Sequence, residues 1–110
     1  MTIEYDDFER VELRIGTVTA VEDFPLARNP SYRITVDFGP DLGERRSSVQ
    51  ATNYSEEDLL GAQVIAVVNF APKNIAGFMS EVLVLGVPGR DGRISLLTPS
   101  RGAERGGRVY

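Results

Sequence analysis

The 110-residue chain contains no cysteine and no histidine, and its only lysine is Lys73. The absence of cysteine excludes disulfides, thiol nucleophiles and thiolate metal sites. The absence of histidine removes the commonest general base and the commonest metal ligand. A serine nucleophile would need Lys73 as its base, and Ser80 follows it by seven residues. Because a serine and a lysine in one loop are more often incidental than catalytic, we expect no enzyme and no metal or other cofactor.

We also expect no membrane-spanning segment and no secretory signal. No apolar run approaches the roughly 18 residues of a membrane-spanning helix. The first twelve residues, MTIEYDDFERVE, are acidic and have neither the basic nor the apolar part of a secretory signal. We therefore expect a cytoplasmic protein, forming one domain over residues 1–110. A domain of this size buries only about 60–70% of its unfolded surface, so pairing with a second copy would help its stability.

The net charge of −4 is unevenly distributed along the chain. Residues 1–58 hold six arginines and thirteen acidic side chains, a net −7, whereas residues 59–110 have a net charge of +3. An acidic chain is a poor candidate for tight non-specific nucleic-acid binding, which depends on neutralising phosphates. The basic second half nevertheless leaves room for a local anionic or polar partner.

The first predicted strand covers residues 11–21. Val11, Leu13 and Ile15 alternate with polar residues, and the apolar phase shifts by one position after Gly16. A one-residue shift at a glycine is typical of a β-bulge, so we expect the strand to bend at Gly16.

Further strands are indicated by apolar alternation or short apolar runs. They are expected at residues 32–39, 45–52, 63–70, 81–87 and 93–97. The last two flank Asp91-Gly92, a pair that favours a tight hairpin. Residues 22–31 and 71–80 are predicted to be loops.

One helix is predicted, over residues 53–61. Ser55 is a natural N-cap, and the acidic residues that follow it suit the positive end of the helix dipole. Leu59 supplies an apolar contact and Gly61 ends the helix.

This order of elements favours an all-β fold: a five-stranded OB-fold barrel with one short helix between strands three and four, plus N- and C-terminal extensions. An SH3-like barrel is the alternative, but the helix after the third strand favours the OB-fold. OB barrels bind elongated ligands across strands two and three, between the first-second and fourth-fifth loops. Those loops would be residues 22–31 and 71–80.

The two loops and the second strand supply the candidate peptide-binding groove. Its residues are Arg28, Tyr32, Arg33, Lys73, Ile75, Phe78, Met79 and Ser80. The alternative for Ile75, Phe78 and Met79 is that they cap one end of the barrel core, since single exposed apolar residues need no special explanation.

Three stretches carry a resemblance to a known family: residues 7–39, residues 43–52 (GERRSSVQAT) and residues 67–86 (VVNFAPKNIAGFMSEVLVLG). The chain resembles the OB-fold tRNA-binding domain family, seen as free-standing tRNA-binding dimers and at the C-terminus of many bacterial methionyl-tRNA synthetases. Within that family it is most similar to CsaA-type export chaperones, over essentially its whole length.

The chain departs from the tRNA-binding members of that family at informative positions. The shared positions are Asn69, Pro72, Lys73, Ser80 and Glu81. The tRNA-binding members tend to carry further basic residues where this chain has Ala71, Asn74 and Ala76, and a Gly-Met pair where it has Val82-Leu83. Losing phosphate partners should weaken RNA binding sharply. The remaining apolar loop suits varied apolar segments of unfolded polypeptide better.

The resemblance implies an ATP-independent chaperone that binds apolar segments of unfolded precursor proteins, acts as a homodimer and meets the export translocation ATPase. The dimer would be formed by the two ends of the chain, through Ile3, Tyr5, Phe8, Val109 and Tyr110. The alternative for these residues is disordered termini.

A tRNA-binding protein or module that recognises folded tRNA is the second interpretation. Its candidate RNA contacts are Arg45, Arg46, Asn69, Lys73 and Ser80, supported by the basic tail with Arg101, Arg105 and Arg108. A third interpretation is an assembly module whose groove holds no ligand.

Overall fold

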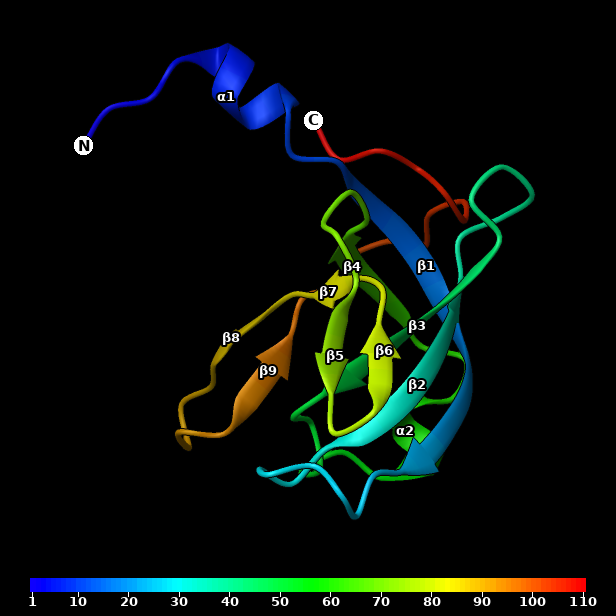
Figure 1. Ribbon diagram of the computed structural model, residues 1–110. Coiled ribbons are helices and arrows are strands. Elements are labelled where there is room, and N and C mark those ends of the chain that lie inside the picture. The colour runs from blue at the N-terminus through cyan, green and yellow to red at the C-terminus, as the bar shows by residue number, and fades with distance from the viewer.

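Strand β1 (Leu13–Asp23) organises the fold because two different strands pair with its two halves (Figure 1). In this computed structural model, which describes residues 1–110, β4 (Gln63–Val67) pairs with the first half of β1 and β2 (Tyr32–Asp37) pairs with the second half. The order of the main sheet is β3-β2-β1-β4-β7, all antiparallel. The nearly closed five-stranded barrel confirms the predicted OB-fold.

The remaining elements follow the chain in order. They are α1 (Tyr5–Glu9), β3 (Glu44–Val49), α2 (Glu56–Leu59), β5 (Lys73–Ile75), β6 (Phe78–Ser80), β7 (Leu83–Val84), β8 (Gly86–Pro88) and β9 (Ile94–Leu96). Helix α2 lies between the third and fourth barrel strands, as predicted. The Ser55 hydroxyl accepts a hydrogen bond from the Asp58 N–H (3.1 Å), which confirms the predicted N-cap. Helix α1, a single turn near the N-terminus, was not predicted.

The bend in β1 lies at Thr19 and not at Gly16. The pairing of β1 with β2 shifts register between Val18 and Ala20, whereas pairing with β4 continues regularly through Gly16. The position predicted for the bulge is therefore wrong. Glycine is needed at position 16 because a Cβ there would lie 2.3 Å from a methyl carbon of Val36.

The core lies inside the barrel and is made largely of the inward-facing residues of β1, β2 and β4. The predicted alternation along the second strand is confirmed, since Ile34, Val36 and Phe38 are each at most 1% exposed. Leu59 of α2 is equally buried, so the helix is attached by an apolar contact as well as by its cap.

Within residues 71–80, predicted to be a loop, residues 73–80 form the hairpin of β5 and β6. The prediction failed because the turn, Ala76-Gly77, places a non-glycine residue at positive φ (50°), which the sequence does not suggest. The hairpin predicted around Asp91-Gly92 is confirmed as β8 and β9, with Gly92 at φ 80°.

Side chains complete the barrel where β3 meets the last residue of β6 and the segment that follows it. Four hydrogen bonds join them: Glu81 N–H to the Arg46 carbonyl (2.8 Å), Arg46 N–H to Glu81 Oε1 (2.9 Å), Ser48 N–H to Ser80 Oγ (3.1 Å) and Ser47 Oγ to the Val82 carbonyl (2.9 Å). Only the first joins two backbone groups. The side chains of Ser80 and Glu81 therefore take the place of a regular strand ladder.

Candidate functional site

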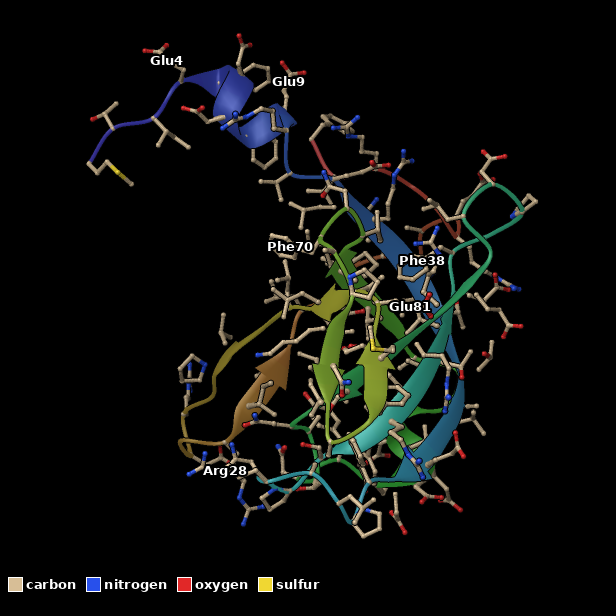
Figure 2. The ribbon with its side chains drawn as sticks, viewed as in Figure 1. Glu4, Glu9, Arg28, Phe38, Phe70 and Glu81 are labelled. Atoms are coloured by element: carbon tan, nitrogen blue, oxygen red, sulfur yellow. The ribbon has the colours of Figure 1, made fainter.

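A groove of about 1010 Å³ lies beside the β5–β6 hairpin. Its walls come from the β1–β2 loop, the end of β3, the segment entering β5 and the segment leaving β6. The residues that line it are Ala27, Arg28, Asn29, Ser31, Ser48, Gln50, Phe70, Ala71, Lys73, Asn74, Ile75, Ser80, Glu81, Val82 and Leu83. Figure 2 shows Phe70 and Arg28 toward opposite ends of β5. This is the position that the OB-fold predicts for a ligand.

The hairpin is held in place by Phe78. Its side chain is 9% exposed and its ring packs edge-on against Phe24 of the β1–β2 loop, with 5.4 Å between ring centroids. The guanidinium of Arg46 lies 4.8 Å from the centroid of the Phe78 ring, a cation–π geometry. Phe78 therefore joins the two loops predicted to form the site, but it does not line the groove.

The turn of the hairpin is stabilised locally. The Asn74 side-chain oxygen accepts a hydrogen bond from the Gly77 N–H (2.8 Å). Ala76 and Gly77 both have positive φ, at 50° and 86°, as in a type I′ turn. The hairpin thus presents Lys73 and Ile75 at the groove with a defined backbone.

Four of the eight predicted groove residues line the groove: Arg28, Lys73, Ile75 and Ser80. The other four do not. Tyr32 donates its hydroxyl to the Tyr54 carbonyl (2.9 Å) and packs against the core. Arg33 donates to the Asp23 carbonyl (2.8 Å) and covers the Phe24 ring. Met79 is 49% exposed but lies outside the groove lining.

The sequence analysis missed the apolar residues at the other end of the groove. Phe70 and Leu83 are 57% and 49% exposed. Both lie within predicted strands, residues 63–70 and 81–87, whose apolar runs suggested burial. Phe70 is the last residue of its run, three residues after β4 ends at Val67, so its place at the end of the run could have identified it. Leu83 follows the buried Val82, so strand alternation could have identified it as outward-facing.

The positive charge available at the groove is small and local. Arg28 and Lys73 are exposed and make no ion pair or side-chain hydrogen bond. Glu81 also lines the groove, but one of its oxygens is used for barrel closure. The groove thus has two free cations and one carboxylate, a net positive charge, whereas the chain as a whole has a net charge of −4.

Most of the candidate RNA contacts have partners within the chain. Arg46 forms an ion pair with Glu22 (2.7 Å), and Arg45 donates to the Leu42 carbonyl (3.2 Å). The Asn69 side chain accepts from Glu12 N–H (2.9 Å) and also donates to the Arg10 carbonyl (2.8 Å), so it fixes the segment between α1 and β1.

In the basic tail, only Arg101 lacks a partner. Arg105 pairs with Asp37, and Arg108 donates to the Glu9 carbonyl (2.7 Å). Of the positive side chains proposed to contact RNA, only Lys73 and Arg101 make no ion pair or side-chain hydrogen bond within the chain.

The two ends of the chain lie at the same end of the molecule, and α1 projects away from the barrel (Figure 1). Ile3 and Tyr5 are 56% and 67% exposed, and Tyr110 is fully exposed. Phe8 and Val109 are half-buried, and the Val109 N–H donates to the Leu13 carbonyl (2.9 Å). Three of the five proposed dimer residues, Ile3, Tyr5 and Tyr110, thus have apolar side chains that the chain itself leaves uncovered.

A second, polar groove of about 820 Å³ lies between the β2–β3 turn and residues 103–105. Asp37 lines it, and its pKa is held below the usual value by the Gly39 N–H, which donates to it at 2.8 Å, and by the Arg105 guanidinium. No group of three or more acidic side chains is placed to hold a metal ion. No helix is long and apolar enough to cross a membrane.

The barrel and its groove define an OB-fold binding domain. A family model described as "Putative tRNA binding domain" matches residues 13–108. The CsaA chaperone protein from Picrophilus torridus is 45% identical, with a TM-score of 0.94 over 99% of this chain and 100% of that chain. Chaperone CsaA from Bacillus anthracis str. Ames is 47% identical, with a TM-score of 0.92 over the whole of both chains. The protein belongs to the tRNA-binding domain family, as a CsaA-type member.

Methionine–tRNA ligases are also relatives. The ligase from Parabacteroides distasonis is 33% identical over 109 residues, which cover 97% of this chain but only 16% of the ligase. The chain thus spans about one sixth of that relative's length. The family and the CsaA fold describe a non-catalytic binding module, which in the ligases is one part of an enzyme.

Proposed function

We propose that this protein is an export-related chaperone that binds apolar segments of unfolded precursor proteins without a nucleotide. The observation that carries the proposal is the groove beside β5, which combines exposed apolar side chains with only two free cations. The similarity to CsaA chaperones over the whole chain supports the same function.

The apolar side chains of Phe70, Ile75 and Leu83 would contact an apolar segment of the client. Burying one Leu-sized side chain gains only about 1.5–3 kcal/mol, so one groove alone should bind weakly and release readily. Arg28 and Lys73 would contact acidic side chains or carbonyl groups of the client. Two grooves on one dimer would raise the apparent affinity through effective concentration.

The homodimer is part of the proposal. Its support is that Ile3, Tyr5 and Tyr110 are each exposed at the end of the molecule where both termini lie. Light scattering should give a dimer for the full chain and a monomer after removal of residues 1–9. An undiminished dimer after that deletion would refute the interface. Contact with the export translocation ATPase completes the proposal, and calorimetric titration of the two purified proteins tests it.

Suppression of client aggregation tests the chaperone function. Diluting a chemically unfolded precursor into stoichiometric protein without nucleotide should suppress light scattering, and Ile75→Ser should weaken the suppression. Val87→Ser is the matched control, since Val87 is 47% exposed on β8 but lies outside the groove. Equal activity of both variants would contradict the assignment of the groove.

Binding of folded tRNA is the second candidate function. It is favoured by the family model and by the methionine–tRNA ligase relatives. Its available phosphate contacts include Arg28, Lys73 and Arg101, which are exposed and make no ion pair or side-chain hydrogen bond. Replacing these three with glutamine should abolish tRNA binding if they carry it, while replacing the paired Arg45 should have less effect.

A further inference from the structure

Strand β5 has a neighbour on one side only. It pairs with β6, and no other backbone hydrogen bond involves residues 73–75. An unpaired strand edge presents N–H and C=O groups that can bind another extended chain. Soluble proteins usually cover or charge such edges, and here Lys73 stands at the start of the strand.

The register of the hairpin shows which residue of β5 has its backbone N–H and C=O groups on the unpaired edge of the strand. Ile75 and Phe78 flank the two-residue turn, so they exchange both of their backbone hydrogen bonds. Hydrogen-bonded pairs alternate with non-hydrogen-bonded pairs along an antiparallel ladder. Asn74, opposite Met79, is therefore in a non-hydrogen-bonded pair, and its N–H and C=O point away from β6.

The outward edge of β5 borders the groove. Residues 73, 74 and 75 all line it, and it continues past the strand to Phe70 at one end and toward Arg28 at the other (Figure 2). The exposed cations Lys73 and Arg28 complement a negatively charged occupant. The groove therefore offers backbone hydrogen bonds, apolar contacts and positive charge along one line.

We propose that an extended segment of unfolded polypeptide with at least one acidic side chain adds to β5 as a further strand. This inference rests on the peptide-binding function proposed above and states its mode of recognition. The backbone groups of Asn74 bind the client's backbone, which every sequence provides. Lys73 and Arg28 bind its acidic side chain, and its alternate apolar side chains face Ile75 and Phe70. Backbone recognition explains how one small groove can accept many clients.

Backbone-modified peptides test strand addition directly. The probe is a labelled peptide of about eight residues, long enough to pass the three residues of β5. It has leucine or valine at alternate positions and two glutamates. One series carries N-methyl groups at odd positions and the other at even positions. The apolar alternation fixes the register, because a one-residue shift would turn the apolar side chains away from the groove.

One series should bind the full-length protein roughly tenfold more weakly than the unmodified peptide, because it loses the hydrogen bonds to the strand edge. The other series should bind within about twofold of it. A parallel test uses Asn74→Pro, which removes the outward N–H at an edge position where proline is tolerated. Asn74→Ala is its control, since both variants lose the side-chain bond to Gly77.

Three results would overturn the proposal, and they separate it from the function on which it rests. Equal binding by both N-methyl series, with normal peptide affinity, would refute strand addition alone. Equal peptide binding by Asn74→Pro and Asn74→Ala, with both folded by circular dichroism, would do the same. If total tRNA bound but the unmodified peptide did not, both the mode of recognition and the chaperone function would fail.

Discussion

Gly16 is the position where a single added methyl group should damage the fold most clearly. A Cβ at this site would lie 2.3 Å from a methyl carbon of Val36 and 2.8 Å from two ring carbons of Phe38. Ordinary carbon contacts lie at about 3.5–4.0 Å, so the overlap is about 1 Å. Val36 and Phe38 are 0% and 1% exposed and cannot move into solvent. Overpacking a core costs about 1–3 kcal/mol, and we expect Gly16→Ala at the upper end of that range.

The assay is thermal unfolding followed by circular dichroism. A loss of about 3 kcal/mol should lower the Tm by about 12 °C for a domain of this size. Gly102→Ala is the control, because no heavy atom lies within 4 Å of its added Cβ and its φ is not positive. A Gly16→Ala variant that melts within about 2 °C of the unchanged protein would refute the packing argument.

Three further substitutions have defined outcomes. Ser80→Ala leaves the Ser48 N–H without its side-chain acceptor and should cost about 1 kcal/mol in urea unfolding, whereas Ser95→Ala, which breaks no side-chain bond, should cost nothing measurable. Asn69→Ala removes two hydrogen bonds to the N-terminal segment, so hydrogen exchange there should accelerate while the barrel stays protected. The pKa of Asp37 is lowered on folding, so its contribution is present above about pH 4 and is lost as the pH falls further. Asp37→Asn should therefore make urea stability less dependent on pH below about 4, and an unchanged acid profile would contradict this.

The barrel could be predicted from sequence because its signals are local. The alternation of Ile34, Val36 and Phe38 specifies a strand with one buried face, and Ser55 marks the start of a helix. The bulge was misplaced because a glycine suits both a bulge and a close approach of neighbouring strands. Only the positions of Val36 and Phe38 in space and the observed strand register distinguish the two cases.

The candidate site was harder to predict because it depends on contacts between distant segments. Lys73 and Ile75 were assigned to a groove that they do line, but Phe78 folds inward against Phe24. Ser80 was assigned to ligand binding, and its hydroxyl also closes the barrel. Shared family residues can thus have structural roles that a sequence does not distinguish from binding roles.

The chaperone function is tested most directly by comparing two ligands at two salt concentrations. Fluorescence anisotropy should be measured with an unfolded precursor segment and with total tRNA, at about 50 and 300 mM salt. The account predicts peptide binding that falls only modestly with salt, since apolar burial and backbone hydrogen bonds carry most of it and only two cations contribute. It predicts tRNA binding that is weak and lost at the higher salt concentration. Tight, salt-sensitive tRNA binding with no peptide signal would contradict it.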